Sequence, residues 1–147
     1  MYSFNHYAYG AIGDWLYRKV AGIDLHPEVP GFRHFIIKPH PFGEMNDVKA
    51  SHLSPYGEIR SEWSVTNGKM QLKVTIPVNT TAESFVPSTG TALTVDGEKA
   101  QTMKITNAPG TDYHYIRLTK GSGTYLFEAE FDNGSQLVLS TTYSRRK

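Results

Sequence analysis

Two carboxylates that could share a catalytic task lie close together in the sequence. Glu58 and Glu62 flank Arg60, each separated from it by one residue. Glycoside hydrolysis uses a pair of carboxyl groups, one as general acid and the other as general base or nucleophile. The same three residues alternate with other positions of one strand pattern, however, and Glu-Arg-Glu on the polar face of a strand forms an ordinary charge ladder. We therefore predict a solvent-exposed ladder here.

Six histidines offer imidazole nitrogens to a metal ion, and the chain has no cysteine to join them. They are His6, His26, His34, His40, His52 and His114. No two of them stand two or four residues apart, and no His-Glu-x-x-His pattern occurs, so the usual local metal-ligand spacings are missing. A meeting of histidines in the folded chain stays open, but we predict separate histidines, no metal site and no cofactor.

Composition excludes several other classes of function. The chain has 147 residues and a net charge of +1, which fits one ordinary domain and gives no reason to expect a nucleic acid or an anionic membrane as partner. No apolar run approaches the roughly 18 residues of a membrane span. The sequence contains no Gly-x-Ser-x-Gly, Gly-x-Gly-x-x-Gly or phosphate-binding loop motif, so nothing supports a serine hydrolase or a nucleotide-binding protein.

The N-terminal segment has the pattern of an amphipathic helix. Its apolar residues recur at spacings of three and four, as on one face of an α-helix: Phe4, Tyr7, Ala8, Ala11, Ile12, Trp15 and Leu16. Ser3 is a suitable N-cap, and Gly22 and Pro27 provide stop signals. The stripe is broader and more aromatic than one sheet edge would cover. We infer a missing neighbour, and we expect the isolated chain to self-associate through residues 4–16.

From Phe32 onward the pattern changes to the period of two that is typical of β-strands. The strongest signal is a hairpin in which residues 58–65 and 70–76 alternate on either side of a type I′ turn at Asn67-Gly68. Further strands are predicted at 32–38, 48–53, 82–86, 92–95, 114–118 and 124–131. The predicted fold is mainly β: an N-terminal α-helix followed by an antiparallel β-sandwich. We divide the chain into a helix and linker (1–30), a sandwich (31–131) and a polar tail (132–147).

Two sets of residues could bind a sugar. Asn5 and His6 stand among aromatic residues of the N-terminal segment, and sugars are commonly held by ring faces combined with hydrogen-bonding side chains. On the residues alone, an aromatic packing helix is the simpler interpretation. In an independent carbohydrate-binding module, Tyr56 and Trp63 could instead form a stacking platform. Trp63 shares its strand face with apolar Ile59, however, so we expect it to point into the core.

The run from Ser3 to Tyr17 closely resembles a segment of bacterial α-L-rhamnosidases of glycoside hydrolase family 78. The resemblance continues in shorter stretches: Pro30-Gly31-Phe32, Ile36-Ile37-Lys38-Pro39, Ser54-Pro55-Tyr56-Gly57, Ile76-Pro77-Val78-Asn79-Thr80-Thr81-Ala82 with Val86-Pro87, and Gly121-Ser122-Gly123-Thr124-Tyr125. It covers residues 3–131 approximately. In that family the first run is the last helix of an (α/α)6-barrel catalytic domain, and the others belong to a C-terminal β-sandwich.

The resemblance implies the C-terminal portion of an enzyme that hydrolyses terminal α-L-rhamnosyl residues of L-rhamnose-containing glycosides with inversion. His6 matches the family's pocket histidine that contacts rhamnose, and Asn5 is its neighbour in the motif. The general acid and general base are glutamates of the missing (α/α)6 barrel, upstream of this run, so we expect the chain alone to be inactive. The family also implies a periplasmic or extracellular location in a bacterium.

Overall fold

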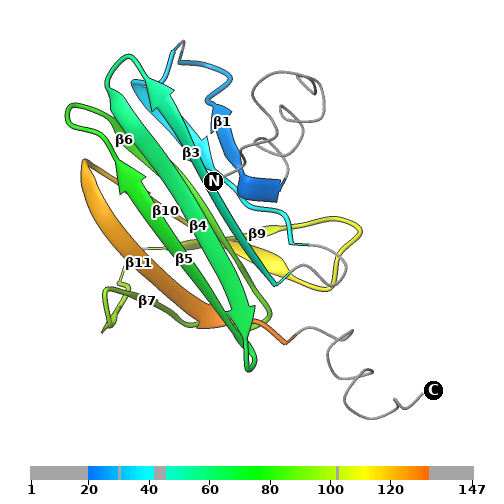
Figure 1. Ribbon diagram of the computed structural model, residues 1–147. Helices are drawn as coiled ribbons and strands as arrows, with labels where there is room; N and C mark the ends of the chain where they lie inside the picture. Colours follow the sequence, from blue (N-terminus) through cyan, green and yellow to red (C-terminus); the bar gives the residue numbers. More distant parts are fainter. Residues whose placement is uncertain (1–19, 30, 42–45, 102, 133–147) are drawn as a thin grey trace.

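The computed structural model describes residues 20–29, 31–41, 46–101 and 103–132 (Figure 1). These residues form eleven strands and no α-helix. The strands are β1 (Ile23–Leu25), β2 (His34–Ile37), β3 (Asp47–Ser54), β4 (Gly57–Thr66), β5 (Lys69–Ile76), β6 (Thr81–Ser88), β7 (Leu93–Val95), β8 (Glu98–Lys99), β9 (Lys104–Asn107), β10 (His114–Lys120) and β11 (Gly123–Glu130). In the part of the chain that is described, no helix is long and apolar enough to cross a membrane.

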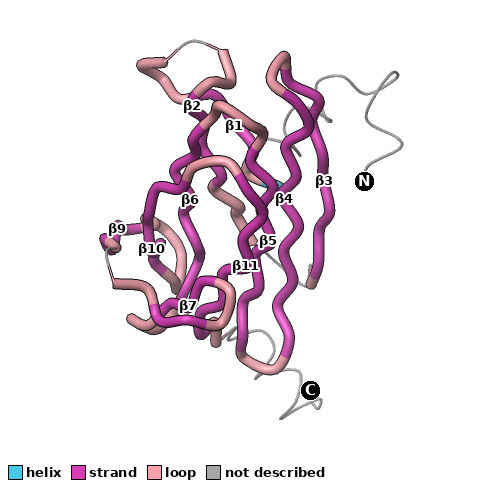
Figure 2. Tube along the Cα trace, turned by 90° about the vertical axis from the view of Figure 1, so that its left-hand side faces the viewer, coloured by secondary structure: helices cyan, strands magenta, loops and turns pink. Residues whose placement is uncertain are grey.

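The strands form two sheets that face each other (Figure 2). The strand order is β1-β2-β6-β10-β9 in the first sheet and β3-β4-β5-β11-β7-β8 in the second. Successive side chains of a strand point to opposite faces, so both sheets contribute apolar residues to one core. Phe35 and Ile116 of the first sheet are fully buried, as are Leu72 and Phe127 of the second. The predicted mainly β sandwich is therefore confirmed.

The predicted hairpin is present as β4 and β5. Its register places Trp63 opposite Leu72. The turn residues Asn67 and Gly68 have φ angles of 54° and 75°. A type I′ turn needs a positive φ at both central residues, and asparagine followed by glycine adopts it most readily. This local turn therefore sets the register of two interior strands of the second sheet.

The prediction of an N-terminal α-helix has to be corrected. Its apolar stripe, 4–16, lies outside the described residues, and the described part of the predicted helix-and-linker segment contains no α-helix. Val20 and Ala21 have π-helical backbone geometry, and Gly22 follows them with a φ of 87°. Strand β1 follows at once and pairs with β2 in the first sheet.

The predicted antiparallel pairing also has to be corrected, because one pair of neighbouring strands is parallel. Strands β2 and β6 are parallel neighbours, with His34 opposite Thr81 and Ile37 opposite Ser84. Between these two strands the chain crosses to the second sheet, where it forms β3, β4 and β5. Strands β1, β8 and β9, with three, two and four residues, were not predicted. Strands this short carry at most a weak period of two, although the equally short β2 and β7 were predicted at 32–38 and 92–95.

Candidate functional site

Asn5 and His6, the predicted sugar-contacting residues, lie outside the described residues. The described chain starts at Val20, fourteen residues after His6. Its first three residues, Val20, Ala21 and Gly22, show how the N-terminal segment is attached to the sandwich. We call these three residues the N-terminal anchor.

Strand β4 holds the first two residues of the N-terminal anchor. The Trp63 indole N–H donates a hydrogen bond to the Val20 carbonyl oxygen at 2.8 Å, and the Ser61 hydroxyl donates one to the Ala21 carbonyl oxygen at 2.7 Å. Val20 and Ala21 are both fully buried. Buried carbonyl groups without a partner are costly, so these two side chains of the second sheet make it possible for the anchor to lie in the core.

The third residue fastens the N-terminal anchor to the first sheet. The Lys38 amide donates a hydrogen bond to the Gly22 carbonyl oxygen at 2.8 Å. A Cβ atom at Gly22 would lie 2.3 Å from the Lys38 carbonyl carbon and from the Pro39 nitrogen. Only glycine fits here, because both the space and the positive φ exclude a side chain. The N-terminal anchor is thus tied to both sheets of the sandwich.

The stacking platform of an independent carbohydrate-binding module does not form. Trp63 is 2% exposed, so its ring is inside the core, as the alternation in β4 predicted. Tyr56, in the turn between β3 and β4, is 43% exposed and stands without it. A sugar bound here could stack only on the ring of Tyr56, because the ring of Trp63 lies in the interior of the sandwich.

The carboxylates of the predicted charge ladder face solvent. The Nε atom of Arg60 lies 3.1 Å from Glu58 Oε1, and its Nη1 atom lies 3.8 Å from Glu62 Oε2. The side chains of Arg60 and Glu58 are about half exposed, at 51% and 46%. A catalytic acid needs an environment that differs from that of its partner, whereas Glu58 and Glu62 both pair with the same half-exposed arginine. The predicted ladder is confirmed.

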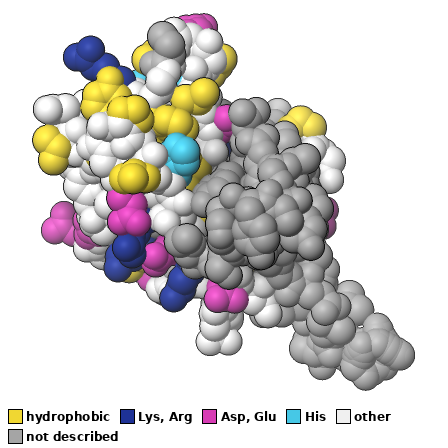
Figure 3. Space-filling view, turned by 45° about the horizontal axis from the view of Figure 1, so that its top comes forward, with side chains coloured by type: hydrophobic (Ala, Val, Ile, Leu, Met, Phe, Trp, Pro, Cys, Tyr) yellow, Lys and Arg dark blue, Asp and Glu magenta, His cyan; other side chains and the backbone are white. Residues whose placement is uncertain are grey.

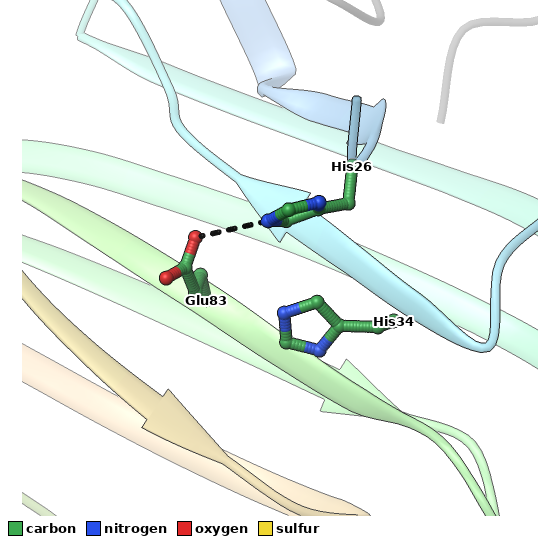
Figure 4. A group of neighbouring side chains, drawn as sticks. All are labelled: His26, His34 and Glu83. Atoms are coloured by element: carbon green, nitrogen blue, oxygen red, sulfur yellow. Dashed lines mark ion pairs between the residues drawn. The ribbon is translucent and has the colours of Figure 1, made fainter. Parts of the chain in front are cut away.

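Two histidines that are eight residues apart meet a glutamate on the outer face of the first sheet (Figure 4). His26 follows β1, His34 opens β2 and Glu83 lies in β6. One ligand atom from each lies within 4.8 Å of the others, and His26 Nε2 is 3.9 Å from Glu83 Oε1. We call these residues the histidine–glutamate cluster. The prediction of separate histidines was wrong for this pair, because the parallel pairing of β2 with β6 leaves no mark in the local sequence.

A groove of about 920 Å³ runs beside this cluster. Charged side chains dominate its walls, among them Glu83, Arg117 and Lys120, and its one aromatic residue is Tyr125. The Tyr125 hydroxyl lies 3.1 Å from the Gly121 carbonyl oxygen, and the Lys120 ammonium stands 5.5 Å from the centre of the Tyr125 ring. The ring face is thus already covered by a cation, which leaves little apolar surface for a sugar to stack on.

Exposed apolar side chains gather at the end of the sandwich where β3 turns into β4 and β5 into β6 (Figure 3). Leu53 is 80% exposed, Val78 71% and Tyr56 43%. Apolar groups grouped at one end of a domain are typical of a surface that contacts another protein part. This end is therefore a candidate contact surface for a neighbouring domain.

The known proteins whose sequences resemble this chain are alpha-L-rhamnosidases. A sequence model described as "Bacterial alpha-L-rhamnosidase C-terminal domain" matches residues 22–101. An alpha-L-rhamnosidase of Formosa agariphila is 36% identical over 132 residues, which are 89% of this chain and 14% of that protein. One of Streptomyces avermitilis is 41% identical over 88 residues, which are 60% of this chain and 8% of that protein.

Solved structures that resemble the fold of this chain are also alpha-L-rhamnosidases. The alpha-L-rhamnosidase from Dictyoglumus thermophilum superimposes with a TM-score of 0.67 and 26% identity over 81% of this chain and 13% of that one. The Streptomyces avermitilis enzyme, complexed with L-rhamnose, gives a TM-score of 0.64 and 32% identity over 87% of this chain and 12% of that one.

The strand order defines a two-sheet β-sandwich, and the N-terminal anchor is bonded to both of its sheets. The chain belongs to the family of bacterial alpha-L-rhamnosidase C-terminal domains. It spans 14% or less of the length of the curated relatives that it matches.

Proposed function

We propose that this chain is the C-terminal portion of an α-L-rhamnosidase that releases terminal α-L-rhamnosyl residues from glycosides with inversion. The family membership and the small share of each relative that the chain covers support this proposal. The general acid and general base then lie in the (α/α)6 barrel that precedes the sandwich in the whole enzyme. In this arrangement the sandwich braces the barrel, and the exposed apolar end at Leu53, Tyr56 and Val78 is a surface for that contact.

Within the chain, His6 and Asn5 are proposed to contact the rhamnose, with His6 in the wall of the pocket. The observation that carries this proposal is the N-terminal anchor, which ties the chain to both sheets fourteen residues after His6. The buried hydrogen bonds fix the point at which this segment joins the sandwich, and a fixed point of attachment favours the precise positioning that a pocket residue needs.

A hydrolysis assay tests the division of labour. The isolated chain should not cleave an aryl α-L-rhamnoside, because it supplies neither carboxylate of the reaction. In the whole enzyme, His6→Ala should lower kcat/KM roughly tenfold or more, the cost of one lost polar contact with the substrate, while the matched variant His52→Ala should not. Cleavage by the isolated chain that disappears in His6→Ala would refute the proposal.

An amide NMR titration tests binding by the isolated chain, with D-glucose as the control sugar. We expect L-rhamnose to shift the signals of Asn5 and His6. Shifts confined to the surroundings of Tyr56 and Trp63 would favour an independent carbohydrate-binding module instead.

Self-association of the isolated chain through the apolar residues of segment 4–16 is a further part of the proposal. Sedimentation equilibrium should show dimers or larger species, and a clean monomer at high concentration would contradict it.

A further inference from the structure

We propose that the histidine–glutamate cluster binds one divalent transition-metal ion, with Zn²⁺ as the best match. His26 and His34 would each supply a ring nitrogen and Glu83 a carboxylate oxygen. Two imidazoles and one carboxylate are a regular zinc ligand set, and water completes the coordination in partly exposed sites of this kind.

The backbone already brings the three ligands together. His34 and Glu83 come from parallel neighbours, and His26 comes from the turn that connects β1 to β2. A tetrahedral zinc ion needs its ligand atoms about 3.3 Å apart, given bonds of about 2.0 Å. The present separation of His26 Nε2 from Glu83 Oε1 is 3.9 Å, and all three ligand atoms lie within 4.8 Å of one another. Small side-chain rotations at this partly exposed position close that difference.

Neighbouring groups already orient two of the three ligands. His34 Nδ1 lies 2.5 Å from the Thr81 hydroxyl oxygen, which directs the other ring nitrogen of His34 toward Glu83 (Figure 4). Arg117 Nη1 lies 3.9 Å from Glu83 Oε2, so the Oε1 atom is the one turned to His26. Hydrogen bonds and ion pairs behind the ligands are a regular feature of metal sites, because they fix the ligand orientation and the histidine tautomer.

The third ligand has to change its tautomer when the ion binds. The Glu28 amide donates a hydrogen bond to His26 Nδ1 at 3.1 Å, so in the ion-free protein the proton of a neutral His26 ring is on Nε2. Binding through Nε2 moves this proton to Nδ1 and releases the Glu28 amide, which lies in an exposed turn and can bond to water instead. This release gives the site a specific signature, since the Glu28 amide signal should shift when the ion binds.

Zinc titration of the untagged 147-residue chain tests the proposal by calorimetry and by histidine NMR. At about pH 7.5, where free histidine is mostly neutral, we expect one saturable site and shifts of the His26 and His34 ring signals together with the Glu28 amide. His34→Gln and Glu83→Gln should each weaken binding about tenfold or more, since even the loss of a group that orients a ligand costs that much. His52→Gln and Glu62→Gln are matched controls with unchanged affinity.

Further controls test for zinc binding by another histidine and for loss of folding in the variants. His6→Gln is included because His6 is a further imidazole of the chain, and it should leave the affinity unchanged. A dispersed amide spectrum confirms that each variant is folded, and two ligand variants on different strands guard against one failing to fold. Absence of saturable binding up to about 1 mM Zn²⁺, a free energy of only about −4 kcal/mol, would overturn the proposal. So would an affinity that is equal in the ligand variants and the controls.

Discussion

The indole N–H of Trp63 and the carbonyl oxygen of Val20 are joined by a hydrogen bond of 2.8 Å in the core. One partner belongs to β4 of the second sheet and the other to the first described residue of the chain. Because Trp63 is 2% exposed and Val20 fully buried, water cannot replace either group. The one aromatic residue of the β4–β5 hairpin thus also bonds to the segment that carries the proposed pocket residues.

Trp63→Phe should therefore destabilise the sandwich strongly. The variant leaves the Val20 carbonyl buried without a donor, which costs about 1–3 kcal/mol, and the smaller ring adds the cost of a cavity. Urea unfolding followed by circular dichroism measures the free energy of unfolding. Ser61→Ala should lose about 1–3 kcal/mol through the Ala21 carbonyl alone.

Ser64→Ala is the matched control, because Ser64 is on the other face of the same strand and is only partly buried. Its effect should stay within about 0.5 kcal/mol. Equal stability of Trp63→Phe and the unaltered chain would show that the hydrogen bond to Val20 does not support the fold.

Two glycines with the same backbone angle provide a second test of the N-terminal anchor. Gly22 and Gly97 both have a φ of 87°, but a Cβ at Gly22 would meet Lys38 and Pro39 backbone atoms, whereas one at Gly97 would have nothing within 4 Å. Gly97→Ala should cost only the strain of the positive φ, about 1–2 kcal/mol. Gly22→Ala adds a backbone clash, so it should cost several times more or prevent folding.

Thermal unfolding of both glycine variants checks this difference. Similar melting temperatures for the two would contradict the close approach of Gly22 to β2.

How much of this structure the sequence predicts depends on the range of the interactions. The β4–β5 hairpin was predictable because Asn67-Gly68 and the flanking alternation act within twenty residues. The inward orientation of Trp63 followed from the same alternation. By contrast, β1, β8 and β9 are defined by strands that they pair with, and their own few residues carry no period.

The candidate metal site could not be predicted from the sequence for the same reason. The histidine–glutamate cluster depends on the parallel contact of β2 with β6, between which the chain forms three strands of the other sheet. No spacing rule for histidines or carboxylates detects such a contact. One signal for the cluster was available in the sequence. In β2 and in the first half of β6, the alternation places His34 and Glu83 on the outward face of the sheet, next to buried residues.

The charge ladder of β4 should contribute little to stability. Its Arg60 pairs with Glu58 and Glu62 are exposed, and such ion pairs are worth about 0–1 kcal/mol. Arg60→Ala should accordingly change the free energy of unfolding by less than about 1 kcal/mol, and this difference should shrink further in high salt because the charges are screened. A loss well above that, measured by urea unfolding at low and high salt, would mean that the ladder has a structural role.

His52 gives the sandwich a dependence on acid. Burial lowers the pKa of His52 below the ordinary value of 6.5, and its ring packs 4.6 Å from the ring of Phe32. The folded state therefore favours the neutral ring, while the unfolded chain takes up a proton below about pH 6.5. Above that pH both states are neutral at this position and His52 contributes nothing. As the pH falls from 6.5 to the lower pKa of the folded state, proton binding favours unfolding and stability is lost.

Histidine NMR over this range should give His52 a pKa below 6.5. Because other groups titrate in the same range, the informative quantity is the difference between the unaltered chain and His52→Gln, measured as the free energy of unfolding at several pH values. The loss of stability between about pH 7 and pH 5 should be smaller in His52→Gln, since the variant has no ring to protonate at this position. A loss of equal size in both chains would show that desolvation of His52 does not couple its protonation to folding.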